Sequence, residues 1–317
     1  MEIRYNTYSQ YLINKYGERV YKLPVNINVT CPNRDGCIGS GGCIFCDEGG
    51  AAFENLPRSM SVKEQIDENR KYIGKKYKAK KFTAYFQNFT NTYIPLKDFK
   101  QNITDAVEYD DVVALSISTR PDCVRDDYMK FLSEIAKEYN VDVTIELGLQ
   151  TVNYKTLKKI NRGHTLAEFI DAVMTVKKYG FDVCAHIILN LPWDDDDDIK
   201  ECAKILSALR VDQVKLHCLY IVKGTPLEKM YLSGEFNMGE YTDYVNKVIL
   251  FLEYLSPDIV IQRLIGRAKE DRTVFANYST SWWKIKDTID SELERRKTYQ
   301  GAKFNYLGGS AVTKKGY

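Results

Sequence analysis

Short β-rich runs alternate with helical patterns at least six times between residues 25 and 265. The β-rich runs cover residues 25–30, 82–86, 112–118, 141–149, 181–189, 211–220 and, as a seventh candidate, 259–264. Helices are predicted over residues 61–77, 96–107, 126–139, 166–180, 196–209 and 241–255. Strands that are joined through helices run parallel to one another, so the sequence predicts an α/β fold built on a parallel sheet.

The chain shows no internal linker rich in Pro, Gly or Ser between residues 25 and 265. We therefore expect one domain over residues 1–265, followed by a C-terminal extension over residues 266–317 that packs on it and ends in a basic tail. The first 20 residues lack the apolar centre of a signal peptide. No run approaches the ~18 apolar residues of a membrane span. We expect a cytoplasmic protein without a membrane partner.

Each predicted strand carries polar side chains on one face and apolar side chains on the other. In the fourth run, Glu146 lies on the opposite face from Ile145, and Ser118, His186 and Lys215 are the polar members of other runs. A doubly wound sheet is buried on both faces and would not show this asymmetry. A barrel with a polar, ligand-filled interior explains it. We therefore predict a partial (β/α)6 TIM-like barrel, with functional groups where strands end and loops begin.

Four of the eight cysteines fall within residues 31–46, which read CPNRDGCIGSGGCIFC. Thiolates this close together, in a chain expected to be reduced, favour zinc or an iron–sulfur cluster over disulfides. A structural zinc site tends to use two tight pairs, but Cys31 and Cys37 lie six positions apart, unlike Cys43 and Cys46. A [4Fe-4S] cluster held by three thiolates would leave one iron open to a small molecule. The spacing leaves both alternatives open.

Two segments are basic, although the net charge of the chain is only +2. Residues 71–81 hold six lysines and two tyrosines without an acid, and residues 295–317 hold six Lys or Arg with four aromatic residues. Such segments suit a nucleic-acid backbone and unstacked bases. A solvated helix end and a loose basic tail would have the same composition.

The order of these features resembles the radical S-adenosylmethionine (SAM) enzymes, in which three cysteines follow the first strand of a row of βα units. The wide gap between Cys31 and Cys43 resembles the Elongator-catalytic-subunit-like branch of that family. Several phrases resemble its YhcC/YtqA-type members: CPNRDG, FQNFTNTY, STRPDC, ELGLQT, INRGHT, KLHCLYIVKGTPL and IQRLIG. The resemblance spans about residues 5–310.

The resemblance implies roles for individual residues. The cluster ligands would be Cys31, Cys43 and Cys46. The residues that bind SAM would be Phe45, Gln87, Asn88, Ser118, Gln150, Arg162 and His186. The residues left for the substrate would be Arg120, Cys123, Glu146, Lys215 and His217, of which Cys123, Glu146 and Lys215 are the candidate catalytic residues.

The implied activity is reductive cleavage of SAM to methionine and a 5′-deoxyadenosyl radical, which abstracts hydrogen from a substrate carbon. The branch implies tRNA as the substrate, at the C5 side chain of a wobble uridine, and a reductant such as flavodoxin or ferredoxin. Two alternatives remain: radical SAM chemistry on a small metabolite or peptide, and a nucleic-acid-binding protein whose four cysteines hold a structural zinc.

Overall fold

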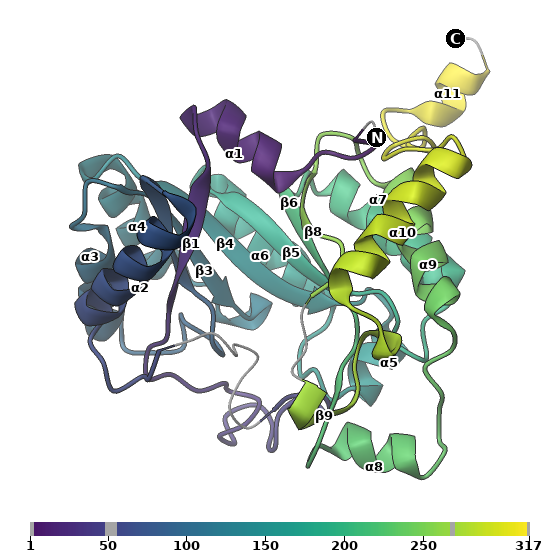
Figure 1. Ribbon diagram of the computed structural model, residues 1–317, viewed down its shortest axis with the longest axis horizontal. Helices are drawn as coiled ribbons and strands as arrows, with labels where there is room; N and C mark the ends of the chain where they lie inside the picture. The colour runs from purple at the N-terminus through teal and green to yellow at the C-terminus, as the bar shows by residue number, and fades with distance from the viewer. Residues whose placement is uncertain (1–2, 48–55, 267–269, 316–317) are drawn as a thin grey trace.

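Seven parallel strands form one curled, open sheet in the computed structural model, which describes residues 3–47, 56–266 and 270–315 (Figure 1). The strands lie in the order β1-β2-β3-β4-β5-β6-β8. Their bounds are β1 Val20–Val25, β2 Lys81–Phe86, β3 Val112–Thr119, β4 Asp142–Gln150, β5 Asp182–Ile188, β6 Gln213–His217 and β8 Val260–Arg263. The predicted partial barrel is confirmed, and the seventh candidate strand is part of it.

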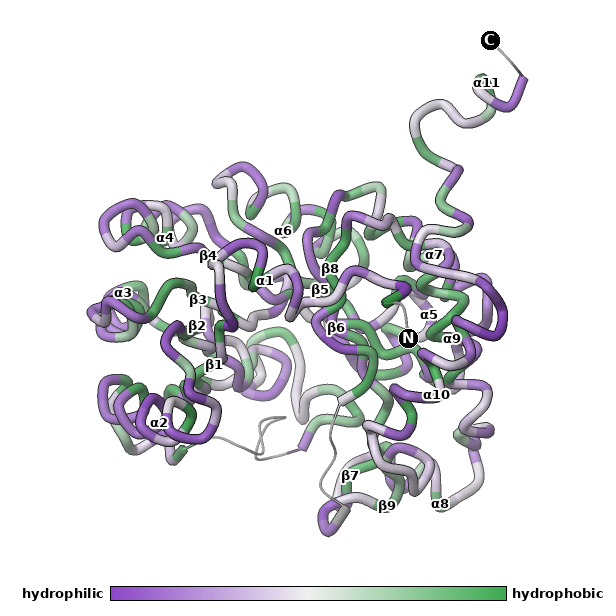
Figure 2. Tube along the Cα trace, turned by 45° about the horizontal axis from the view of Figure 1, so that its top comes forward, coloured by the Kyte–Doolittle hydropathy of each residue, from purple (hydrophilic) through white to green (hydrophobic). Residues whose placement is uncertain are grey.

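Helices cover the outer face of the sheet, and apolar residues fill the space between the two layers (Figures 1 and 2). These helices are α2 Val62–Tyr77, α3 Leu96–Val107, α4 Asp126–Glu138, α6 Leu166–Lys178, α7 Asp196–Ala208 and α9 Tyr241–Tyr254. Their bounds agree closely with the sequence prediction. The predicted capping box is present at α2, where the Ser61 hydroxyl accepts from the Glu64 amide and the Glu64 carboxylate accepts from the Ser61 amide.

The first strand begins five residues earlier than the sequence suggested. The prediction placed it at residues 25–30, but β1 is Val20–Val25 and includes Pro24. Proline cannot donate to a strand ladder, which argues against a central strand at this position. Because β1 lies at the edge of the sheet and pairs only with β2, Pro24 is tolerated. The earlier start brings Lys22 into the polar interior.

The remaining elements cover the ends and the open side of the sheet. They are α1 Tyr8–Tyr16, α5 Tyr154–Lys159, β7 Ile221–Val222, α8 Pro226–Leu232, β9 Thr273–Phe275, α10 Trp282–Arg295 and α11 Ser310–Lys314, with 3-10 turns at Pro121–Cys123, Glu270–Arg272 and Asn277–Ser279. Figure 1 shows α1 crossing the side between β1 and β8, and α11 projecting from the end opposite the cysteine-containing loop. None of the helices in the described ranges is both long and apolar enough to cross a membrane.

Candidate active site

A cavity of about 610 Å³ occupies the interior of the curled sheet, and all seven strands contribute to its lining. The strand residues that line it include Lys22, Tyr85, Ser118, Glu146, Gly148, Gln150, His186, Lys215, His217 and Arg263. The loop that follows β1 lies over this cavity. The predicted polar interior is therefore present.

Three of the four clustered cysteines, Cys31, Cys43 and Cys46, line the cavity, whereas Cys37 is exposed and lies outside it. A tetrahedral zinc ion, with Zn–S bonds of about 2.3 Å, holds its sulfur ligands roughly 4 Å apart. Among the described residues, the three potential ligand atoms that lie within 4.8 Å of one another belong to Glu146, Cys184 and His186. The three loop thiols do not form such a group among the described residues, so they are not preassembled around a single ion.

Each of the three thiols faces its own guanidinium group. The Nη1–Sγ distances are 3.9 Å for Arg120 and Cys31, 3.5 Å for Arg162 and Cys43, and 3.4 Å for Arg34 and Cys46. Positive charge beside a thiol favours the thiolate, which is the form that binds metal. At Cys46, burial outweighs the charge of Arg34 and raises the pKa of the thiol, so the guanidinium groups supply positive charge for an anionic centre without by themselves ionising this thiol.

The cysteine loop is held against the turn that precedes Arg162. The side-chain amide of Asn33 donates to the backbone carbonyl of Asn161 at 2.6 Å, and the side-chain amide of Asn161 donates to the backbone carbonyl of Gly42 at 2.8 Å. A Cβ atom at Gly39 would lie only 2.3 Å from Asn33 Oδ1, so this close approach requires glycine. The role of Asn33 in positioning the loop was not predicted from the sequence.

Gln150 and Arg162, which the family resemblance implies as SAM-binding residues, lie together at the end of β4. Arg162 Nη2 donates to the Gly148 carbonyl at 2.6 Å, and a Cβ atom at Gly148 would lie 2.7 Å from that nitrogen and 2.9 Å from Gln150 Nε2. Gln150 has a left-handed φ of 76°, where the β4–β5 register is irregular. Such strained backbone is typical of functional sites.

The other residues predicted to bind SAM divide into two groups. Phe45, Gln87, Ser118 and His186 line the cavity. Asn88 does not line it, because its side-chain amide donates to Asn26 Oδ1 at 2.9 Å. Asn88 lies in a bend two residues after the end of β2, and this bend carries its side chain to Asn26 instead of into the cavity.

Cys123 also lies outside the cavity lining, beside Asp122 at an Sγ–Oδ1 distance of 3.9 Å. Burial, reinforced by the charge of Asp122, raises the pKa of Cys123 to about 12. The thiol is therefore protonated at neutral pH.

Glu146 is the centre of a buried hydrogen-bond network inside the sheet and is only 1% exposed. Its donors are Lys22 at 2.7 Å, Ser116 at 2.7 Å, Ser118 at 3.3 Å, Tyr85 at 3.0 Å, His186 at 2.7 Å and Lys215 at 2.5 Å. Burial alone would raise the pKa of Glu146, but the charges of Lys215 and Lys22 outweigh it and hold this pKa well below its usual range. The carboxylate is therefore ionised.

His186 is held in its neutral form. Burial, together with the charge of Lys215, lowers the pKa of His186 to about 4, although the hydrogen bond with Glu146 opposes this change. His217, on the neighbouring strand, also has a pKa well below its usual range because of burial and the charge of Arg263. The two imidazoles thus act as neutral hydrogen-bonding groups.

Stability is expected to fall as the pH is lowered from about 6.5 to 4. In this range His186 is protonated in the unfolded chain but not in the folded protein. Protonation of this one group therefore lowers the free energy of unfolding by up to about 3 kcal/mol. Below that range, the low pKa of Glu146 adds a further loss. Urea unfolding at several pH values measures the slope, which should be shallower in His186→Gln. Equal slopes in the two proteins would contradict the neutral, buried imidazole.

Two family models match the chain. The model described as the radical SAM superfamily covers residues 25–206, and the model of the Radical_SAM C-terminal domain covers residues 211–295. The first match alone covers more than half of the chain and includes the cysteine loop.

Similar proteins extend over nearly the whole chain. YtqA of Bacillus subtilis is 36% identical over 306 residues, which cover 96% of this chain and 94% of that protein. YhcC of Escherichia coli is 32% identical over 303 residues, which cover 96% of this chain and 95% of that protein. A tRNA uridine(34) acetyltransferase of Methanocaldococcus jannaschii is 31% identical over 140 residues, which cover 43% of this chain and 25% of that enzyme.

The structure of the Methanocaldococcus infernus Elp3 protein with an N-terminal deletion superposes with a TM-score of 0.69 at 17% identity, covering 89% of this chain and 64% of that one. At this identity the match concerns the fold. The family model and the full-length relatives go further: the chain belongs to the radical SAM superfamily of enzymes, with YtqA and YhcC among its relatives, and this family implies a [4Fe-4S] cluster and SAM as cofactors.

Proposed function

We propose that this protein cleaves SAM reductively at a [4Fe-4S] cluster held by Cys31, Cys43 and Cys46. The observation that carries the proposal is that these three thiols, each beside a guanidinium group, open onto the polar cavity of a parallel half-barrel. When bound, the cluster would supply the electron that splits SAM into methionine and a 5′-deoxyadenosyl radical able to abstract hydrogen from the substrate. Flavodoxin or ferredoxin would deliver that electron.

The protein's own groups would stabilise the cluster electrostatically. Arg34, Arg120 and Arg162 bring positive charge to three thiolates, and hydrogen bonds to cluster sulfur raise the reduction potential. A fourth side chain is not required, since the open iron is the place for the amine and carboxylate of SAM. Cys37 has no ligand role in this proposal.

Gln150 and Arg162 would hold SAM beside the cluster, with Phe45, Gln87 and Ser118 completing the surface around it. His186 would meet the ribose. Its Nε2 is engaged by Glu146, which leaves Nδ1 of the neutral ring to accept a hydrogen bond from a hydroxyl group. Glu146 and Lys215, deeper in the cavity, would face the substrate.

Replacing Gly148 by alanine is expected to weaken SAM binding at least tenfold while changing stability little. The new Cβ would displace the flexible ends of Arg162 and Gln150, which it would approach to 2.7 and 2.9 Å. Calorimetric titration of SAM into the anaerobic, cluster-loaded protein measures the affinity. Gly74→Ala in α2 is the matched control, because its Cβ would make only ordinary contacts. Unchanged affinity in Gly148→Ala would contradict the assignment of Arg162 and Gln150.

For the substrate, we propose the C5 side chain of a wobble uridine in tRNA. The partial similarity to a tRNA uridine(34) acetyltransferase supports this assignment. The basic segment 71–81 supports it independently, because Tyr72 is 61% exposed there and Tyr77 stacks on Tyr21, a residue that lines the cavity, at a centroid distance of 5.0 Å. Basic and aromatic side chains thus lead from the surface toward the site.

The C-terminal basic segment contributes less to this argument. Arg295 and Arg296 both pair with Glu292, and Lys303 pairs with Glu253. Acids outside the segment therefore neutralise these three cations and reduce the positive charge available to a nucleic acid.

Two assays test the proposal. Anaerobically reconstituted protein with dithionite and SAM should release 5′-deoxyadenosine and methionine, whereas a colourless, zinc-loaded protein without this activity would refute radical SAM chemistry. For the substrate, tRNA nucleosides from a deletion strain should show a changed modification of uridine 34. An unchanged nucleoside profile would refute the tRNA assignment and would favour a small metabolite or peptide.

A further inference from the structure

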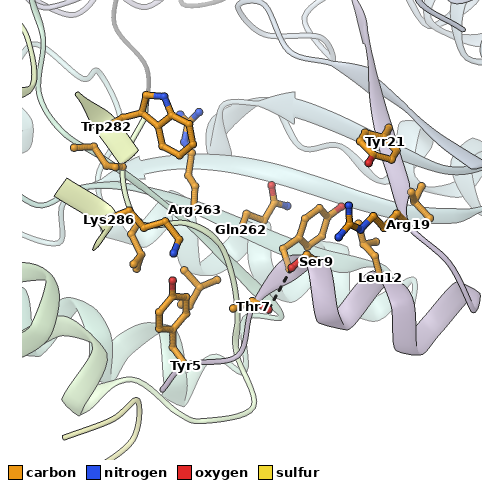
Figure 3. A pocket seen from close by; sticks show the side chains of 15 residues that line it. Tyr5, Thr7, Ser9, Leu12, Arg19, Tyr21, Gln262, Arg263, Trp282 and Lys286 are labelled. Carbon is orange, nitrogen blue, oxygen red and sulfur yellow. Dashed lines mark hydrogen bonds between the residues drawn. The ribbon is translucent and has the colours of Figure 1, made fainter. Parts of the chain in front are cut away.

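A second cavity, of about 440 Å³, adjoins the central one on the open side of the sheet. Figure 3 shows side chains from α1, β1, β8 and α10 around it, with Trp282, Lys286 and Arg263 near one another and Arg19 at the other end beside Leu12. The two cavities share the lining residues Tyr8, Val20, Tyr21, Gln262 and Arg263. The side cavity therefore leads toward the interior where β1 and β8 do not pair.

Arg263, at the junction of the two cavities, is a cation without an acidic partner among the described residues. Its Nη2 lies 2.8 and 3.2 Å from the two ring nitrogens of His217, and its Nε is buried without a hydrogen-bond partner. Within the described part of the chain, the acid of the adjacent hydrogen-bond network is Glu146, which already binds Lys22 and Lys215. Three cations thus face one carboxylate.

A second unsatisfied donor lies next to this guanidinium. The hydroxyl oxygen of Tyr220 is buried, has no hydrogen-bond partner and lines the central cavity. Burial raises the pKa of Tyr220, and the charge of Arg263 offsets this only in part. The phenol therefore keeps its proton. The two groups are close neighbours, because a Cβ atom at Gly266 would lie 2.5 Å from the Tyr220 hydroxyl oxygen and 3.4 Å from Arg263 Cζ. Buried polar groups are almost always satisfied, so this pair suits a ligand that accepts hydrogen bonds.

We propose that Arg263 and Tyr220 bind an oxyanion of the substrate, a carboxylate or a phosphate, at the junction between the side cavity and the central cavity. This inference rests on the proposed function, since the anion belongs to the molecule that is attacked there. The guanidinium fork matches either oxyanion through two parallel hydrogen bonds, and the phenol supplies a third. The surplus of two positive charges around Glu146 favours a ligand of opposite sign.

The side cavity indicates the rest of the substrate. Tyr5, Tyr8, Tyr21 and Trp282 line it, so a flat or apolar group could occupy it while the anion contacts Arg263. None of its lining residues is a cysteine of the 31–46 loop. Arg263 and Tyr220 also line the central cavity, so the anion site opens onto the same space as the cysteine loop and reaches the side cavity through Arg263.

Thermal unfolding of the cluster-loaded protein tests the inference. The unfolding midpoint is measured while inorganic phosphate or acetate replaces chloride at constant ionic strength. Wild-type protein should show a saturable rise in midpoint with at least one of the two oxyanions. Arg263→Gln should raise the half-saturating concentration at least tenfold, Arg263→Lys less, and Tyr220→Phe several-fold. Arg19→Gln removes a charge from the far end of the same cavity and should leave the response unchanged.

Tighter binding of phosphate than of acetate identifies a phosphate-bearing substrate. Tighter binding of acetate than of phosphate identifies a substrate that carries a carboxylate. The inference is overturned if neither oxyanion differs from chloride, if Arg263→Gln responds like wild type, or if Arg19→Gln loses the response equally. Circular dichroism of each variant verifies folding, and Arg263→Lys keeps the charge should Arg263→Gln fail to fold. SAM cleavage without oxyanion binding refutes this inference alone, whereas oxyanion binding without SAM cleavage refutes the proposed function.

Discussion

Replacing Cys43 by alanine is expected to abolish reductive cleavage of SAM, with a loss well above 100-fold. Even the outer partners of a metal site are worth roughly 10–100-fold, and Cys43 is assigned as a direct ligand. The residue is 6% exposed and faces Arg162, so its removal would leave a buried guanidinium beside an incomplete site. The measurements are 5′-deoxyadenosine formed per minute, iron bound per chain, and absorbance near ~400 nm after anaerobic reconstitution.

Cys37→Ala is the matched control for this experiment. Cys37 belongs to the same loop, but its side chain is exposed and lies outside the cavity. The variant should bind iron and cleave SAM as the wild type does. If Cys37→Ala loses the cluster while Cys43→Ala retains it, the assignment of the ligands is wrong.

Replacing Glu146 by glutamine is expected to destabilise the protein by about 3–5 kcal/mol, the usual cost of removing one partner from a buried ion pair. Glutamine keeps the shape but leaves Lys22 and Lys215 without a countercharge inside the sheet. Urea unfolding at pH 7 measures the difference. The variant should also lose substrate turnover, because Lys215 would no longer be held in place.

Two further variants make this prediction specific. Glu146→Gln combined with Lys215→Met should be more stable than Glu146→Gln alone, because it removes one of the stranded cations. Glu292→Gln removes a carboxylate that also pairs with two cations but lies at the surface, and it should change stability much less. A stability loss in Glu146→Gln no larger than that in Glu292→Gln would contradict a buried, ionised Glu146.

Much of the fold follows from local patterns. Alternating strands and helices require a parallel sheet, and the polar face of each strand requires a polar cavity inside that sheet. Both features appear as predicted. The first strand was predicted five residues too late, and the actual strand β1 includes Pro24, a residue that central strands exclude. That proline is acceptable only because β1 is at an edge, and an edge position depends on the order of all seven strands.

The candidate site was predicted less completely. Side-chain alternation identified Glu146, His186 and Lys215 as interior residues, and the structure brings all three together. Lys22 was not predicted as an interior residue, because the strand that carries it, β1, was placed at residues 25–30. The direction of a long side chain, such as that of Arg34 toward Cys46, depends on contacts that spacing alone does not reveal.

Electron–nuclear double resonance of the reduced, SAM-bound protein tests the central claim most directly. SAM carrying a 15N-labelled amino group should give a 15N coupling to the cluster, because that nitrogen would occupy the iron left open by Cys31, Cys43 and Cys46. The coupling should be absent with unlabelled SAM and from Cys43→Ala. A cluster that shows no 15N coupling, but instead a coupling from a protein side chain on the fourth iron, would contradict the account.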